Sequence, residues 1–290
     1  MPRRLPWLIS CCLAACVPVL GLVIAVAPAA GASAATSHPP SQYARALAAA
    51  RAALRHLRVG EHGTDHAVRG NHARVRGLTQ VQSTNWSGYA DDNTKGNTYS
   101  TVTGSWTEPS VSCTSQTSLA AFWVGIDGFT SGSVEQDGTL AECYLRTAYY
   151  FTWWEMYPTN SIQVVGESVR PGDSISASVV RSGSSYTLKV TDSSRSGDSF
   201  TTTQSCSSCA NSSAEWIAEA PSGSSGVYPL SDFHSWTLSG ATVKSGSSGV
   251  ISTFPDDELT MVDSSGLVKA QPGALNGSGN GFSVTWERST

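Results

Sequence analysis

Beyond residue 83 the chain has few of the side chains that usually carry covalent or metal-dependent chemistry. This part has one histidine, His234, and four cysteines. It has no HExxH pattern, no phosphate-binding glycine loop and no Asp-rich calcium loop, so nothing indicates a metal ion, a nucleotide or another cofactor. His234 has no GxSxG partner, and we interpret it as a turn or strand-end residue rather than as part of a serine triad. The chemistry that remains is that of carboxyl and carboxamide groups among aromatic side chains.

Positive charge is also scarce in this part of the chain. Residues 83–290 have nine Lys and Arg against twenty Asp and Glu, whereas residues 1–82 have nine against two. An acidic body argues against nucleic acid as a partner. A basic leader can dock on that body and leave when its carboxylates protonate. We therefore interpret residues 35–82 as a propeptide that inhibits the body near neutral pH; a disordered linker is the alternative.

A long apolar run occurs at the N-terminus. Residues 1–34 combine Arg3 and Arg4, an apolar stretch and the small-x-small sequence Ala32-Ser33-Ala34, the pattern of a secretory signal peptide. A membrane anchor is the alternative. The cleavage-like end favours export, so we expect a secreted protein with no stable membrane anchor. The next stretch, SQYARALAAARAALRHLR, has helical spacing, which makes the predicted propeptide partly helical.

The four cysteines of the body predict two disulfides, because an even number in an exported chain is typical of a disulfide framework. Of three possible pairings we expect Cys113–Cys143 and a tight Cys206–Cys209 bridge. A CxxC sequence also occurs in zinc and redox sites. Here there is no second CxxC and no βαβ pattern, which favours a structural bridge.

Residues 83–290 are predicted to form one all-β domain. About a dozen short β-rich runs alternate with Gly, Ser, Asn and Asp turns; they include AAFWVGI, AYYFTWW, GVISTF and FSVTW. This number of strands indicates a sandwich of two large packed antiparallel sheets. Because cations are few, few carboxylates can depend on salt bridges for their ionisation, and we expect the fold to tolerate acid.

Two stretches place polar groups beside aromatic ones. In FWVGIDGFTSGSVEQDGT, Asp127 precedes a glycine and Gln136 follows in a second short run. Turn chemistry accounts for Asp127 equally well, and Gln136 alone would be an ordinary polar residue. In FTWWEMYP, Glu155 is enclosed by aromatic residues. The surroundings of Glu155 fit a substrate groove or a sandwich core with an outward glutamate.

The stretch AEWIAEA places two glutamates in an apolar run. If it is a strand, Glu215, Ile217 and Glu219 share one face, and Trp216 and Ala218 share the other. A buried carboxylate is unfavourable unless it is paired or hydrogen-bonded. The alternative is the solvent face of an exposed strand.

Together, NWSGYA, SWTEPSV, WVGIDG, VEQDG, WWEMYP, PGDSI and AEWIAEAP resemble the glutamic peptidase family, the eqolisins, in a bacterial-type secreted form. The resemblance covers about residues 84–287. It implies a concanavalin-like β-sandwich of two large antiparallel sheets, secretion with a propeptide, and acid-dependent cleavage of protein or peptide substrates. We further expect a monomer.

The resemblance also implies the site. It makes Gln136 and Glu219 the catalytic pair, with Glu219 taking a proton from the attacking water and Gln136 stabilising the oxyanion. Further residues match positions that line the substrate cleft or support the pair: Trp86, Trp123, Asp127, Glu155 and Tyr157. No metal or other cofactor is implied.

Two other functions remain open from the sequence. A lectin-like sandwich with aromatic residues and paired carboxylates also suits a glycoside hydrolase, although no compact E-x-D-x-x-E strand motif occurs. A secreted carbohydrate- or protein-binding module would bind a ligand without turnover. In such a module Glu219 and Gln136 would be dispensable.

Overall fold

The computed structural model describes residues 74–75, 78–92 and 94–290. The predicted signal peptide and most of the predicted propeptide, including its helix, lie outside these residues. The described part is dominated by strands, with two short 3₁₀ turns, η1 (Ser196–Asp198) and η2 (Ile251–Thr253). None of the described residues belongs to a helix long and apolar enough to span a bilayer.

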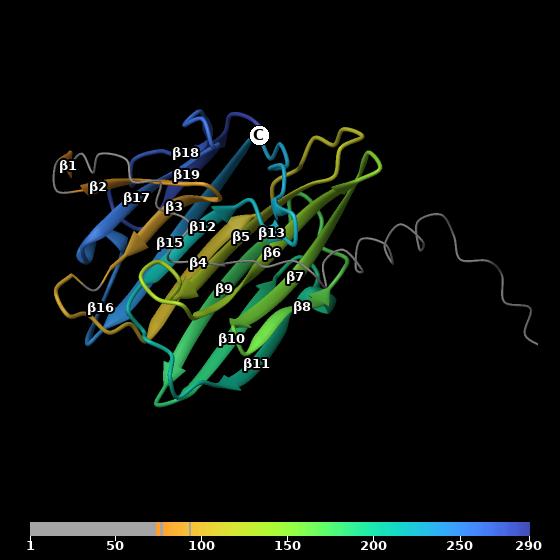
Figure 1. Ribbon diagram of the computed structural model, residues 1–290. Coiled ribbons are helices and arrows are strands. Elements are labelled where there is room, and N and C mark those ends of the chain that lie inside the picture. Colours follow the sequence, from red (N-terminus) through yellow and green to blue (C-terminus); the bar gives the residue numbers. More distant parts are fainter. Residues whose placement is uncertain (1–73, 76–77, 93) are drawn as a thin grey trace, which may run out of the picture. The chain divides into compact units, whose positions relative to one another are not determined.

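The strands pack in two layers (Figure 1). Successive pairings give the first layer the order β8 (Asn160–Gly166), β7 (Thr147–Tyr157), β6 (Val134–Tyr144), β5 (Ser118–Ile126), β12 (Ala214–Glu219), β3 (Trp86–Asp91), β17 (Asp256–Val262), β2 (Leu78–Ser83) and β1 (Arg74–Val75). The second has the order β11 (Phe200–Ser205), β10 (Ser185–Asp192), β9 (Ser174–Ser182), β4 (Thr101–Thr107), β15 (Ser235–Ser245), β19 (Phe282–Trp286) and β18 (Val268–Pro272). This arrangement confirms the predicted all-β sandwich.

One strand joins the two layers. β18 pairs with β19 and also with β17, so seventeen strands form one continuous hydrogen-bonded network. The pairing of β2 with β17 is parallel, unlike the antiparallel arrangement that we expected throughout. β16 (Ser247–Gly249) extends β15, and β13 (Ser222–Gly223) and β14 (Gly226–Val227) form a separate ribbon.

Most of the predicted runs are strands, but GVISTF is not. Ile251–Thr253 form η2 instead. The hydroxyl of Thr253 accepts a hydrogen bond from Val250 N (2.9 Å), and Thr253 N donates to Val250 O (2.8 Å). These local bonds satisfy groups that a sheet partner would otherwise pair, as Ser and Thr side chains commonly do.

The core between the layers is rich in aromatic side chains. Phe122 of β5 stacks on Trp236 of β15 at 5.4 Å, which joins the two layers directly. On β12, Trp216 belongs to this core, whereas Ile217 packs with Trp123 in a second apolar cluster on the opposite face. The predicted alternation is therefore confirmed. We call the face of the first layer that carries Trp123 and Ile217 the outer face.

The exposed-strand alternative for β12 is wrong. Glu215 and Glu219 are both 0% exposed. Both predicted disulfides are present, Cys113–Cys143 and Cys206–Cys209.

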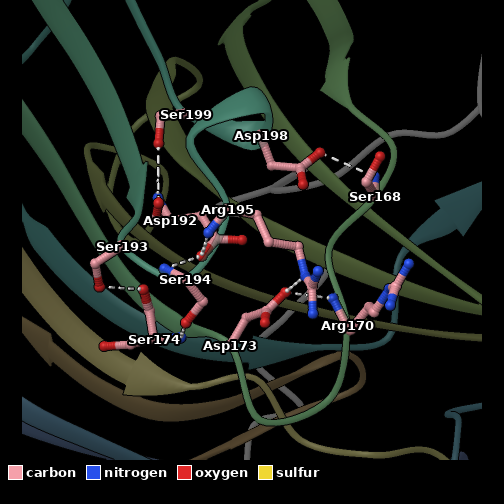
Figure 2. Close-up of polar contacts among 10 residues, drawn as sticks. All are labelled: Ser168, Arg170, Asp173, Ser174, Asp192, Ser193, Ser194, Arg195, Asp198 and Ser199. Atoms are coloured by element: carbon pink, nitrogen blue, oxygen red, sulfur yellow. Dashed lines mark hydrogen bonds and ion pairs between the residues drawn. The ribbon is translucent and has the colours of Figure 1, made fainter.

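Loops at the end of the second layer are held by carboxylates (Figure 2). Asp173 forms an ion pair with Arg195 (Nε to Oδ2, 2.8 Å), and Asp198 accepts a hydrogen bond from Ser168 N (2.9 Å). The loop between β8 and β9 is thereby tied to the turn between β10 and β11.

Candidate active site

Four strands of the first layer bring the predicted site residues onto one face. Glu219 pairs with Ala121 across β12 and β5, Gln136 pairs with Gly125 across β6 and β5, and Gln136 also pairs with Glu155 of β7. Figure 1 shows these strands side by side in the order β12, β5, β6, β7. Gln136 and Glu219 thus lie on either side of β5 and are offset along it, with Trp123 between them.

The Glu219 carboxylate receives hydrogen bonds from two side chains. Trp123 Nε1 donates to Oε2 at 2.9 Å, and Asn85 Nδ2 donates to Oε1 at 3.3 Å. Ser83 Oγ donates to Asn85 Oδ1 (3.3 Å), which orients the amide so that its nitrogen faces Glu219. Such bonds favour the ionised form of a carboxyl group. The sequence could not show these donors.

The Gln136 side chain is fixed by its neighbour on β7. Its Nε2 donates to Glu155 Oε2 at 2.9 Å, and both residues are buried. A side chain at Gly125 would place its Cβ 2.8 Å from the Trp123 ring and 3.3 Å from Gln136 Cβ. Glycine at this position therefore leaves room for the indole beside the amide. Glu155 lies on the outer face of the first layer, and its side chain is buried there rather than exposed to solvent.

Three aromatic residues surround this pair. Trp86 and Trp123 meet edge to face, with ring centroids 5.1 Å apart, and both are buried. Tyr157 is partly exposed at the end of β7 and shares the face of Glu155, because the two residues are two positions apart on one strand. All three aromatic residues are therefore on or beside the outer face.

Asp127 anchors the segment before β12 to the end of β5. It ends β5 with a left-handed backbone (φ 70°) and accepts hydrogen bonds from Asn211 N (2.7 Å), Ser212 N (2.7 Å), Ser212 Oγ (3.1 Å) and Ser133 Oγ (3.2 Å). These bonds anchor the segment that leads into β12. They fit the turn interpretation of Asp127, and its role in substrate binding stays a prediction.

Two further carboxyl groups are buried near Asp127. Burial holds the pKa of Glu215 well above its usual range. Burial, followed by the charge of Asp127, raises the pKa of Glu135 to about 10. Both groups are neutral acids in acid solution.

Sequence reasoning missed Asn85. It is the first residue of an Asn-x-Ser sequence, which reads as a surface glycosylation signal, yet its side chain is 1% exposed and bonded to Glu219. Asn85 belongs to the NWSG stretch that resembles the family, but the resemblance pointed to the tryptophan of that stretch rather than to the asparagine.

His234 lies away from these residues, just before β15, with φ 57°. Its Nε2 is 3.1 Å from Ser112 Oγ and its Nδ1 is 3.2 Å from Asp232 Oδ1. The histidine side chain is 62% exposed, so water competes for these contacts. The turn position predicted for His234 is confirmed.

One group of possible metal ligands lies in the described part of the chain: Glu135, Cys206 and Cys209. The two cysteines form a disulfide, so their sulfurs are not the thiolates that a zinc ion requires. This group therefore does not fit a metal ion in the oxidised protein.

Comparisons with known proteins agree with the fold and show the family. A model of the Peptidase A4 family matches residues 84–271. Aspergillopepsin-2 from Aspergillus niger is 28% identical over 238 residues, which are 73% of this chain and 81% of that protein.

Scytalido-glutamic peptidase, solved with a transition state analog inhibitor, has a TM-score of 0.59 at 23% identity, covering 70% of this chain and 98% of that chain. SCP-B, a member of the Eqolisin family of peptidases solved with the tripeptide Ala-Ile-His, has a TM-score of 0.56 at 22% identity and the same coverage. At these identities the solved structures show a shared fold.

Proposed function

Because the chain belongs to the Peptidase A4 family and is a glutamic endopeptidase, we propose that Glu219 and Gln136 carry out its peptide-bond hydrolysis. The observation that supports this most directly is the pair of donors on Glu219. Trp123 and Asn85 hold a buried carboxylate on the same face as the Gln136 amide. A carboxylate held in this way can stay ionised in moderately acid solution, where a general base must work.

In the proposed mechanism, ionised Glu219 takes a proton from water as the water attacks the scissile carbonyl carbon. Gln136 donates an N–H to the oxygen on which negative charge develops. Its amide nitrogen has two N–H groups, and the one bonded to Glu155 fixes the direction of the other. Protonated Glu219 then donates to the leaving nitrogen, which breaks the C–N bond and restores the carboxylate.

The amide of Gln136 suits the oxyanion role because it does not titrate. It donates a hydrogen bond at every working pH. Glu155 acts through Gln136 and is a positioning residue in this scheme. Trp86, Trp123 and Tyr157 contribute apolar surface beside the pair, and we assign them to substrate contact.

The test compares the wild-type chain with Glu219→Gln, both matured in the same way, on a denatured protein substrate from pH 2 to 7. We expect wild-type cleavage confined to acid and none by Glu219→Gln, with unchanged circular dichroism. His234→Ala is the matched control and keeps full activity. Equal cleavage by Glu219→Gln and wild type would move catalysis elsewhere, with Glu155 the first residue to examine.

The same two proteins, tested on a polysaccharide, separate the alternative functions. Release of reducing sugar from a polysaccharide without peptide cleavage would favour a glycoside hydrolase. Binding without any turnover would favour a carbohydrate-binding module. The family match and the absence of the sugar-hydrolase motif from the sequence support the peptidase.

We also infer that the protein is secreted and acts as a monomer, with residues 1–34 as signal peptide and residues 35–82 as an inhibitory propeptide. The two disulfides in the described part are consistent with an oxidising compartment. β2 spans the proposed boundary at residues 82 and 83 and pairs with β17. Sequencing the N-terminus of the matured protein tests that boundary.

A further inference from the structure

The two disulfides differ in ways that affect their reduction. Cys113 and Cys143 are 30 residues apart; Cys143 is fully buried and Cys113 is partly exposed. Cys206 and Cys209 are three residues apart, and both are partly exposed in the segment before β12. A bridge that closes a short loop restricts the unfolded chain least. Both cysteines of the short bridge are partly exposed, whereas only one cysteine of the long bridge is, and the access of an external thiolate affects the rate of reduction.

A buried carboxyl group lies next to the short bridge. Glu135 has a carboxyl oxygen within 4.8 Å of the sulfurs of Cys206 and Cys209. It is 0% exposed, and the neighbouring Asp127 carboxylate adds, by charge and by hydrogen bonding, to the effect of burial on its pKa. Because its pKa is raised to about 10, first by burial, Glu135 carries a proton at neutral pH. Glu135 is thus a protonated acid beside a sulfur that becomes a thiolate on reduction.

The short bridge is also connected to the catalytic strands. Asn211 Nδ2 donates to Cys209 O (2.8 Å), and the backbone N–H groups of Asn211 and Ser212 hold Asp127 at the end of β5. Glu135 directly precedes Gln136 on β6 and points to the opposite face. A change at the bridge therefore reaches the strands that carry Gln136 and Trp123.

We propose that Cys206–Cys209 is a reversible redox site for a dithiol reductant, with Glu135 as its proton relay. One thiolate of the dithiol attacks a cysteine sulfur, the Cys206–Cys209 bond breaks, and the departing thiolate takes the proton of Glu135. The Glu135 carboxylate then takes a proton from the second thiol. That thiolate attacks the mixed disulfide and releases the other cysteine, which is protonated by solvent. The dithiol is oxidised to a disulfide, and both cysteines are reduced.

Reduction removes the covalent brace on residues 206–209, which lie just before the two N–H groups that hold Asp127 at the end of β5. We expect reduced protein to have lower peptidase activity, by about tenfold or more, because small displacements of catalytic groups have large effects on rate. This consequence for activity rests on the proposed function. The redox chemistry itself does not.

The first experiment treats the full secreted chain at pH 8 with graded dithiothreitol, traps thiols with N-ethylmaleimide and maps the labelled peptides by mass. Cys206 and Cys209 are expected to label together at dithiothreitol concentrations at least about tenfold below those needed for Cys113 and Cys143. Reduction of both bridges at the same concentration would overturn the proposal. The inactive Glu219→Gln chain serves equally well, so failure of the peptidase mechanism cannot be mistaken for failure of the redox site.

A second experiment tests the proton relay. Glu135→Gln is expected to slow reduction of the short bridge about tenfold or more. Asp137→Asn is the matched control, since Asp137 is also fully buried and two residues along the same face of β6; it leaves the rate unchanged. Equal rates for wild type and Glu135→Gln would remove Glu135 from the chemistry.

A third experiment measures acid peptidase activity. It compares wild type trapped in its reduced form with a double variant, Cys206→Ser with Cys209→Ser. Both are expected to show the same loss of acid peptidase activity, and reoxidation restores the untrapped wild type alone. Full activity in the double variant would show that the bridge does not regulate the site.

Discussion

The indole Nε1 of Trp123 donates a hydrogen bond to Oε2 of Glu219 across 2.9 Å, although the two residues are 96 positions apart. The bond joins β5 to β12 and places a neutral donor against the carboxylate. It stabilises the ionised form without adding positive charge to the site. A Lys or Arg side chain at this place would add a positive charge to the site. The indole instead orients the carboxylate and leaves the net charge of the site unchanged.

Replacing Trp123 by Phe removes this donor and keeps an aromatic ring. A hydrogen bond to a charged group is worth about 1.5–3 kcal/mol. We therefore expect the acid side of the pH–rate profile to move to higher pH by about one to two units. Trp153→Phe is the control, because its buried indole nitrogen has no partner in the described part of the chain. An unshifted profile for Trp123→Phe would mean that the bond does not set the ionisation of Glu219.

Replacing Gln136 by Ala removes the proposed oxyanion donor. We expect kcat to fall by roughly 10² or more while KM changes little, because the lost interaction forms in the transition state. Steady-state kinetics on a peptide substrate measures both constants. If kcat is retained, Gln136 has no part in the mechanism.

Replacing Asp127 by Ala leaves the buried N–H groups of Asn211 and Ser212 without their acceptor. Each such group is unfavourable by about 1–3 kcal/mol, so we expect the free energy of unfolding in urea to fall by about 3 kcal/mol. Asp127→Asn keeps an acceptor oxygen and tolerates the left-handed backbone, and its loss is smaller. Identical stabilities for the two variants would mean that the carboxylate does not hold the segment.

The folded protein is expected to be most stable in acid. Burial raises the pKa of Glu108 to about 8 and that of Glu142 to about 7, whereas both would titrate near 4.3 in the unfolded chain. Between about pH 5 and 8 the unfolded chain therefore loses protons that the folded chain keeps. The free energy of unfolding falls as pH rises through this window.

Melting temperatures measured from pH 3 to 8 check this sign. In the wild type, Trp106 Nε1 donates to Glu108 Oε2 at 3.2 Å. Glu108→Gln keeps an acceptor oxygen for this bond and should reduce the difference in melting temperature between pH 4 and pH 8. An early melting transition at pH 3 in the wild type would contradict both this expectation and the predicted acid tolerance.

The leader provides a separate test. A peptide of residues 35–82, added to matured protein, is expected to inhibit near pH 7 and to lose affinity near pH 3, where the body's carboxylates are neutral. High salt weakens the inhibition at neutral pH. Equal inhibition constants at both pH values would exclude the electrostatic switch.

The fold was predictable where local pattern and burial agree. β12 alternates as the sequence indicates, because each face packs against its own apolar cluster. The strand predicted for GVISTF was wrong because the hydroxyl of Thr253 accepts a hydrogen bond from the nearby backbone. The residue composition of the stretch, which is typical of a strand, does not reveal this local bond. The even number of cysteines predicted two disulfides and left three pairings open; the structure has the pairing that we expected.

The site was predictable only in part. Gln136 and Glu219 stood out through the family resemblance, and their common face follows from strand alternation. The contact of Asn85 with Glu219 joins residues 134 positions apart, and the loop held by Asp127 joins residues 84 and 85 positions apart. Such contacts depend on which strands become neighbours, and short-range periodicity contains no information about that.

The strand shared by both layers gives the sandwich a closed side and an open side. β18 joins the layers beside β17 and β19, whereas β8 and β11 are the far edges of their layers. Amide hydrogen exchange should therefore begin at β8 and β11, because edge strands have fewer partners to lose. β12 lies between β3 and β5 and should exchange among the last. The peptidase can thus fray at its open side while the strand bearing Glu219 stays intact.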